Sequence, residues 1–413
     1  MDTTDDAGMA NRLDQYFGRL GAHLKDVRKR ESFAMYAFGI LGDGERKSAE
    51  PIAARAAAEP VKLQTSRNHG KLLHFLARAA WDDHAVRLEA TQYGLEALTK
   101  DEPVGPWILD DTGFLKQGKH SVGVQRQYTG SAGKITNCQI GVSLAVATRS
   151  QHLPIDFELY LPKSWTEDPE LRRETRIPAD VVFKTKPELG LGMIRRAVDD
   201  GIQGDIVLAD SAFGDSSDFR NSLRDLGFDF GVGLHSTTKV VRLGSNGRPR
   251  GEHRSVERVA MAHGRKRFRN LTWRESTNNG AKRRLASRFA FIRVKTTHDD
   301  GLDLGDREPM WLVVEWPSTE PKPTKYILTT LPRRMSKKQI VRTFKERWRT
   351  ERMYEDLKGE LGLDHFEGRS FPGWHHHVSV VLACYAFVVA ERSRAFPPSA
   401  GRSRSCRPLA LAA

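Results

Sequence analysis

The sequence predicts an α/β fold with a mixed sheet, interrupted by a β-rich insertion and preceded by an all-helical segment. Apolar residues recur at helical spacing over 1–98, strand and helix patterns alternate over 99–235, and short β patterns fill 236–330. Helical patterns return over 331–395, and the low-complexity end, 396–413, is predicted to be disordered. A chain of 413 residues is long enough for two or three such domains.

The region 99–235 carries the clearest order of elements. The runs "PWILDD", "TNCQIGVSLAVAT" and "LPIDFELYLP" are apolar or alternate with period two, which indicates three strands. They are followed by a helix ("PELGLGMIRRAVDDGI"), a strand ("GDIVLADSAFGD"), a helix ("DSSDFRNSLRDLG") and a strand ("FDFGVGLH"). The two later strands are each entered from a helix, so we expect them to add in parallel to an antiparallel start.

The second half of the chain begins with basic β patterns and ends with two helices. The strand patterns are "KVVRLG", "LASRFAFIRVKT", "MWLVVEW" and "TKYILTTL". The last predicted helix, "GWHHHVSVVLACYAFVVAERSRA", is apolar almost all round and is therefore predicted to be buried. Its three consecutive histidines, 375–377, point in different directions and do not suit one metal ion, so we expect them at the helix start or on the surface.

The charge balance favours a polyanionic partner. The net charge is +14, with 66 Lys and Arg against 52 Asp and Glu, and such a balance is typical of proteins that bind nucleic acid. The sequence has no 18-residue apolar run and no signal peptide, which argues against a membrane role. The three cysteines are far apart and form no C-x-x-C pair, so a reducing cytoplasm is expected and a structural zinc site is not.

Three acids stand where a metal site could be built. Asp110 and Asp210 directly follow apolar strand patterns, and Glu351 lies on a late helix. Ligands gather at the carboxyl ends of strands in open sheets, and carboxylates from separate elements can converge on Mg²⁺. Two such ions support phosphodiester transfer by activating the attacking oxygen and stabilising the leaving one.

The stretch "FKERWRTERMYEDLKGEL" places one acid among many cations. At 100° per residue, Arg347, Glu351, Tyr354 and Lys358 share one narrow polar stripe of an ideal helix. In one interpretation Glu351 holds a metal while Arg347, Tyr354 and Lys358 contact nucleic acid. In the other, the stripe is a solvated face stabilised by pairs such as Arg347 with Glu351.

Other residues are candidates for nucleic-acid contact. Lys119 and Arg126 lie in a Gly-rich basic segment after the first acid, which suits either phosphate contact or an ordinary hairpin surface. Trp273 lies in the basic stretch "HGRKRFRNLTWR" of the insertion, where it could hold a base or simply pack in the core.

Several motifs together resemble the DDE transposases of bacterial insertion sequences. Phe344, Arg347, Glu351 and Lys358 match the spacing of that family's Y-(2)-R-(3)-E-(6)-K signature, with phenylalanine in place of tyrosine. "LDDTG" resembles the block around the family's first aspartate, and "VLADSAFGD" resembles the second. The resemblance covers roughly residues 103–392.

This resemblance implies a ribonuclease H-like core with a β-rich insertion, and Asp110, Asp210 and Glu351 as ligands of Mg²⁺, with Mn²⁺ as a substitute. Asp111 is the rival of Asp110 for the first position. It also implies a DNA endonuclease and strand transferase that acts as a homodimer on paired transposon ends in the bacterial nucleoid. The helices of 1–98 would then recognise the terminal inverted repeats.

Two other functions remain as alternatives. The chain could be a catalytically silent descendant of a transposase that only binds DNA, although all three acids are present. Paired carboxylates also serve glycosidases, but the basic charge and the lack of an aromatic-lined sugar cleft argue against that class.

Overall fold

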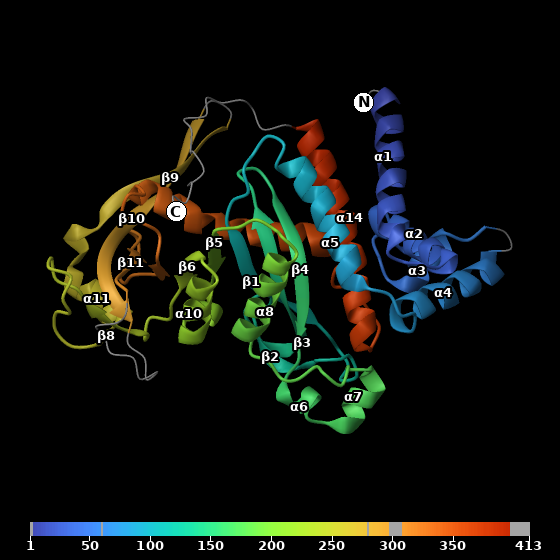
Figure 1. The fold of residues 1–413 in the computed structure, drawn as a ribbon, viewed down its shortest axis with the longest axis horizontal. Helices are drawn as coiled ribbons and strands as arrows, with labels where there is room; N and C mark the ends of the chain where they lie inside the picture. The colour runs from blue at the N-terminus through green and yellow to red at the C-terminus, as the bar shows by residue number, and fades with distance from the viewer. Residues whose placement is uncertain (1–2, 59–60, 279–280, 297–307, 397–413) are drawn as a thin grey trace.

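A mixed sheet runs through the middle of the molecule in the computed structural model (Figure 1). The structure describes residues 3–58, 61–278, 281–296 and 308–396. Within them the strands form one sheet of twelve, in the order β2-β3-β1-β5-β6-β12-β11-β10-β7-β8, with β4 on β3 and β9 on β10. The predicted C-terminal tail lies outside the described residues, apart from Phe396.

The strands and helices predicted for the first half of the sheet occur in the predicted order, and the structure adds β2, α6 and α7 to them. Strand β3 is antiparallel to both β1 and β4, whereas β1, β5 and β6 are parallel to one another. The resulting order, β4-β3-β1-β5-β6, is consistent with the ribonuclease H-like class. The elements are β1 (Trp107–Leu115), β2 (Gln125–Thr129), β3 (Lys134–Ala147), β4 (His152–Tyr160), α6 (Lys163–Thr166), α7 (Pro169–Thr175), α8 (Lys186–Asp199), β5 (Ile206–Ala209), α9 (Ser211–Gly214), α10 (Ser217–Asp225) and β6 (Asp229–Gly233).

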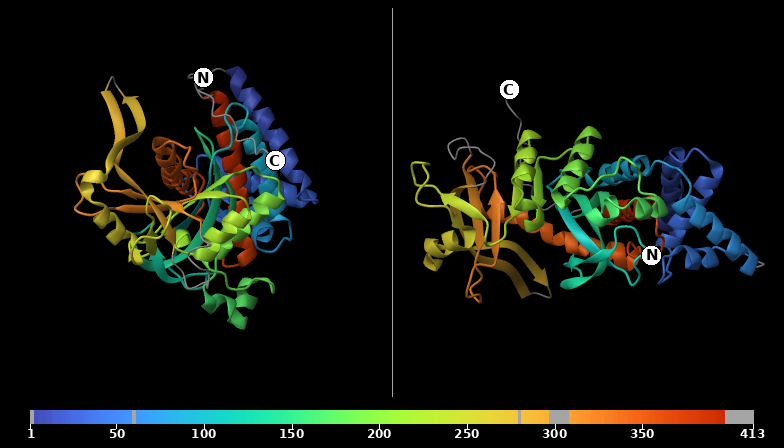
Figure 2. Two further views of the ribbon diagram at one scale, coloured as in Figure 1. Left: turned by 60° about the vertical axis from the view of Figure 1, so that its left-hand side comes forward. Right: turned by 90° about the horizontal axis from the view of Figure 1, so that it is seen from below.

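The strands of residues 236–330 continue the same sheet beyond β6. Strand β12 pairs antiparallel with β6 and joins the two halves, and the long β9–β10 hairpin projects from the far side (Figures 1 and 2). The elements here are β7 (Lys239–Arg242), β8 (Arg254–Ser255), α11 (Val256–His263), the 3₁₀ turn η1 (Arg265–Arg267), β9 (Arg269–Asn278), β10 (Ala281–Thr296), β11 (Met310–Glu315) and β12 (Lys325–Thr329).

In the described residues five helices precede the sheet, and α1, α2, α4 and α5 among them pack on the long final helix, α14 (Phe371–Ala395). The five helices are α1 (Thr3–Ala22), α2 (Val27–Leu41), α3 (Ala49–Arg55), α4 (Val61–Ala77) and α5 (Asp83–Leu98). Helix α5 runs beside α14, and both contact β4, so the helices share one apolar core with the sheet (Figure 1). By length and composition α14 could cross a membrane, but 94% of its apolar window is buried inside the protein, as is typical of a core helix.

The helix expected around Glu351 is divided into four pieces. It begins as α12 (Lys337–Lys345), tightens into the 3₁₀ turn η2 (Glu346–Trp348), continues as α13 (Arg349–Glu355) and ends in the π-helical turn η3 (Asp356–Glu360). Phe344 at the end of α12 is 8% exposed and packs against Phe289 of β10. The contact between Phe344 and Phe289 anchors the start of the run on β10, while α13 contacts β1.

Candidate active site

Asp110 and Asp210 both lie just beyond the last parallel pair of β1 and β5. Asp210 directly follows β5, as predicted, whereas Asp110 does not end its strand, because β1 continues to Leu115 along β3. The last parallel pair between β1 and β5 joins Ile108 with Leu208, and each aspartate follows two residues later. Because side chains alternate along a strand, Asp110 shares the face of Ile108, which packs under α12. The pairing of β1 with β5 therefore brings together two acids that are 100 residues apart in the sequence.

Local structure fixes the turn that carries Asp210. Its Oδ1 accepts a hydrogen bond from the backbone N–H of Ala212 at 2.9 Å and caps the short helix α9. Gly233 of β6 lies against this turn, and a Cβ there would come within 3.0 Å of the backbone carbon of Asp210. Glycine is thus needed on the neighbouring strand for the turn to keep its place.

Arg347 of η2 provides the positive charge at the strand ends. Its Nη1 donates a hydrogen bond to Asp110 Oδ2 at 2.8 Å. Burial opposes the charge of Arg347, but Asp110 and Asp210 outweigh it and raise the pKa of the guanidinium. The predicted nucleic-acid contact of Arg347 is therefore replaced, in this structure, by an ion pair with a candidate metal ligand.

The two aspartates carry an electrostatic penalty. Burial raises the pKa of Asp110 to about 7, and the charges of Asp210 and Asp111 add to the effect against the attraction of Arg347. Burial also raises the pKa of Asp210, again against Arg347. A site in which neighbouring carboxylates resist ionisation has excess negative charge, and a bound cation would relieve it.

Glu351 is exposed on α13, one turn beyond Arg347. Its charge contributes to the raised pKa of Arg347, so the two side chains lie near each other. Among the described residues Glu351 forms no ion pair, whereas the neighbouring Arg352 pairs with Glu355 and Asp356. Within the same residues, no group of three His, Cys, Asp or Glu side chains lies close enough to hold one metal ion.

Asp111 faces the other side of the sheet. Its Oδ2 forms an ion pair with Lys186 Nζ of α8 at 2.8 Å, and the preceding Leu109 packs under Gly190 of the same helix. Lys186 was not singled out by sequence reasoning; its place at the start of a helix that follows the strands was the only available signal. The geometry thus favours Asp110 over Asp111 as the acid that faces α12 and α13.

Tyr354 and Lys358 hold the helical run against the sheet. The Tyr354 hydroxyl lies 2.6 Å from Ser143 Oγ on β3. Lys358 Nζ donates to Thr112 Oγ1 and to the carbonyl of Gly113 on β1, both at 2.8 Å. Of the four residues of the predicted polar stripe, Arg347, Tyr354 and Lys358 contact β1 and β3, whereas Glu351 is exposed.

The other predicted contact residues lie apart from the strand ends. Lys119, in the loop after β1, and Arg126, on β2, are both exposed. Trp273 of β9 is half-buried, with Lys345 Nζ 4.4 Å above its ring and Phe289 at its edge. This packing occupies the Trp273 ring in the present structure.

The three histidines lie near the start of α14, as one alternative predicted, but the other alternative, a place on the surface, was wrong. His375, His376 and His377 are all at least 93% buried, and each has separate partners. His375 lies 3.4 Å from Glu158, and His376 contacts the carbonyl of Leu76. The sequence pattern could not show this, because the burial comes from helices and strands far away in the chain.

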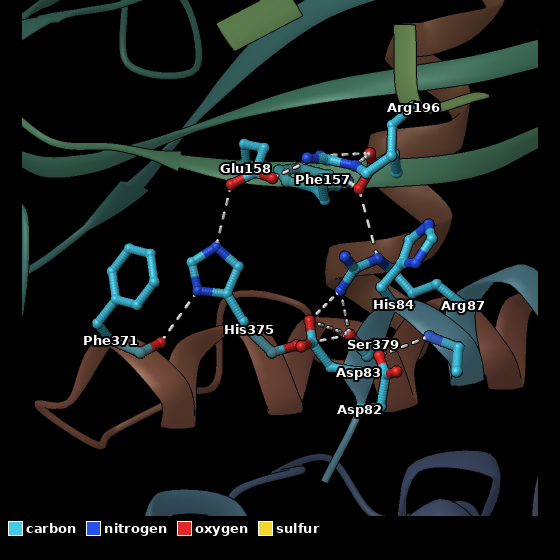
Figure 3. A network of polar contacts seen from close by, with 12 residues as sticks. Asp82, Asp83, His84, Arg87, Phe157, Glu158, Arg196, Phe371, His375 and Ser379 are labelled. Carbon is cyan, nitrogen blue, oxygen red and sulfur yellow. Dashed lines mark hydrogen bonds and ion pairs between the residues drawn. The ribbon is translucent and has the colours of Figure 1, made fainter. Parts of the chain in front are cut away.

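A buried ionic network beside His375 was also missed (Figure 3). Arg87 of α5 pairs with Asp83 and with Asp156 of β4, and Arg196 of α8 bonds to Asp156 and Glu158. The network joins α5, α8, β4 and α14 below the apolar core. Charged residues in alternating or helical patterns read as surface, so only tertiary pairing identifies them as buried.

The chain is similar to known nucleases and transposases. A family model described as DDE superfamily endonuclease matches residues 19–280, more than half of the chain, and one described as transposase DDE domain matches residues 187–387. A probable transposase for insertion sequence element IS701 from Microchaete diplosiphon is 29% identical over 229 residues, which are 55% of each protein. The present chain thus matches about half the length of that curated relative. With a family match of this extent, the chain belongs to the DDE superfamily endonucleases.

Proposed function

We propose that this protein is the transposase of an insertion sequence, cutting DNA at the element's ends and joining them to target DNA. The observation that carries the proposal is the placement of Asp110 and Asp210 just beyond the last parallel pair of β1 and β5, with Arg347 of the helical run that bears Glu351 bonded to Asp110. The likeness to a probable insertion-sequence transposase supports the same activity.

The chemistry of three acids suits a divalent metal, although Glu351 would have to move toward the two aspartates to share one ion with them. Asp110, Asp210 and Glu351 offer the hard oxygen ligands that Mg²⁺ and Mn²⁺ prefer. The raised pKa values of both aspartates fit a site made to receive a cation. A bound divalent ion would activate the attacking oxygen and stabilise the leaving oxygen.

The chain's own residues position this chemistry. Arg347 holds the Asp110 carboxylate in place, while Tyr354 and Lys358 fix the helical run on β3 and β1. Water would attack the phosphorus at the element's end and release a 3′-hydroxyl. That hydroxyl would then attack a target phosphodiester and displace a second 3′-oxygen, with no covalent bond to the enzyme.

We also place the chain in the Y-R-E-K subgroup, with Phe344 in the tyrosine position. Phe344 is buried against Phe289, so at this position the ring anchors α12 and contributes no hydroxyl. We further propose that α1–α5 recognise the terminal inverted repeats and that two copies act on paired ends. Lys119 and Arg126 are exposed and free to contact the DNA that enters the site.

A nicking assay with matched variants tests the proposed function. Supercoiled plasmid carrying the element's ends should be nicked with Mg²⁺ or Mn²⁺ and not with EDTA. Asp210→Asn should lower the rate by roughly 10³-fold, since it removes a charged ligand of the metal ion that would stabilise the reacting phosphate. Asp225→Asn, an exposed acid on α10, is the charge-matched control and should cut like the parent.

DNA binding measured in parallel separates the two candidate functions. If the parent binds the ends but never nicks them under any divalent metal, the silent DNA-binding alternative holds. If Asp210→Asn nicks as fast as the parent, the proposed site is wrong.

A further inference from the structure

A basic cavity, separate from the candidate metal site, lies beside α13. A cavity of about 290 Å³ opens where β4, β9, α13 and α14 approach one another. The cations that line it are Arg274, Arg349, Arg352 and Arg392, against one acid, Asp356. None of these residues belongs to the acid constellation at the strand ends.

Two buried polar atoms of the lining have no partner. The Nε2 atom of His152, a side chain 95% buried, and Nη1 of Arg349 form no hydrogen bond within the described residues. A buried donor left unpaired costs about 1–3 kcal/mol, so such atoms point to a ligand or a bound water. Burial lowers the pKa of His152 to about 3, and the neutral imidazole retains one N–H to donate.

The cations of the cavity are not fully neutralised by its acids. Asp356 is shared by Arg352 and Arg392, at 3.2 and 2.8 Å. Arg349 pairs with Glu346 through Nε, which leaves its Nη1 unused. Among the described residues Arg274 forms no ion pair, and its guanidinium lies over the exposed ring of Trp348 at 5.1 Å.

We propose that this cavity binds a phosphate of a nucleic-acid strand, with Arg274, Arg349 and His152 as the donors. Arginine guanidinium groups and a neutral imidazole N–H together suit the several oxygens of one phosphate. This inference rests on the proposed function, because two arginines of the cavity, Arg349 and Arg352, flank the candidate metal ligand Glu351 on α13. A phosphate held here would fix the nucleic-acid strand beside α13, the helix that carries Glu351.

The salt dependence of duplex binding tests the site. Each phosphate contact contributes about 0.9 to the slope of log K against log salt concentration. Arg349→Gln and Arg274→Gln should each reduce the slope by about 0.9 for a 30-base-pair duplex. Arg173→Gln, which removes an equal charge from the exposed helix α7, should leave the slope unchanged. Arg274 is exposed, so its variant decides the matter if Arg349→Gln fails to fold.

A second measurement separates a strand phosphate from free phosphate. The imidazole NMR signal of His152 should shift on addition of the duplex, and the shift should be lost in Arg274→Gln. If only inorganic phosphate shifts the signal, or if the control variant changes the slope as much as the others, the proposal is overturned. A parent that binds with these slopes but never cuts DNA would refute the enzyme and leave the phosphate site standing.

Discussion

At the scale of single residues, the candidate site depends on how Arg347 balances two acids. Arg347 compensates Asp110 directly, and its charge also lowers the cost of ionising Asp210. The side chain of Arg347 is 33% exposed and that of Asp110 is 16% exposed, so the pair is only partly screened by water. Loss of the arginine leaves neighbouring buried carboxylates without a cation.

Arg347→Met should therefore be metal-sensitive in its stability. In EDTA we expect its free energy of unfolding to fall by about 1–3 kcal/mol, since a buried charge loses its partner. Addition of Mg²⁺ or Mn²⁺ should restore part of the loss, and thermal melts with and without metal measure both effects. Equal melts of parent and variant in EDTA would contradict this view of Arg347.

His377 gives a prediction for pH. Burial between Tyr36 and the Leu363 carbonyl lowers its pKa to about 4, against about 6.5 in the unfolded chain. The unfolded state then binds more protons between pH 6.5 and 4, so stability is complete above pH 6.5 and falls as the pH is lowered. The free energy of unfolding lost through protonation of His377 at low pH is about 3 kcal/mol.

Urea unfolding at pH 7 and pH 4.5 measures this effect. His377→Gln, which cannot be protonated, should lose less stability between the two pH values than the parent does. A larger loss in the variant would show that His377 does not resist protonation in the folded state.

At the scale of elements, the molecule relies on buried charge pairs as well as on apolar packing. The side chain of Arg87 is 6% exposed and joins α5 to β4, while Arg196 joins α8 to the same strand (Figure 3). Buried pairs of this kind fix which elements meet, and breaking one leaves its partner charge unpaired. The network thus ties α5, α8 and α14 to β4.

Arg87→Met should destabilise the protein by about 3–5 kcal/mol, because Asp83 and Asp156 lose their shared partner in the interior. The matched control is Arg173→Met, whose ion pair with Glu170 is exposed, with an expected effect of 0–1 kcal/mol. Chemical denaturation of both variants measures the difference. Equal effects would mean that the network does not hold α5 on the sheet.

At the scale of the whole molecule, the run from α12 to η3 links the strands of residues 236–330 to β1. It starts against β10 and ends against β1, so it spans the two halves of the sheet. Movement of either half would shift Arg347 relative to Asp110. The position of the candidate glutamate therefore depends on the fold as a whole.

The sequence predicted the succession of the main strands and the place of Asp210 after β5, because both are local patterns. It did not predict that β1 continues past Asp110 to Leu115, because the continuation depends on pairing with β3. Alternation defined β3 and β4, and an acid after an apolar run marked Asp110 and Asp210. Strand β2 was missed, since "QRQYT" is polar and its exposed residues lack an apolar face. The 3₁₀ and π-helical turns around Glu351, the Lys186 pair and the buried histidines arise from tertiary contacts, which no sequence period encodes.

We propose above all that Asp110, Asp210 and Glu351 together bind divalent metal at one site. Electron paramagnetic resonance of Mn²⁺ bound to the DNA complex tests it directly, with Asp110→Asn, Asp210→Asn and Glu351→Gln compared with the Asp225→Asn control. We expect each of the three variants to weaken Mn²⁺ binding at least about tenfold, as loss of a charged ligand should cost more than about 1.4 kcal/mol. Unchanged Mn²⁺ binding in all three variants would contradict the assignment of these acids as metal ligands.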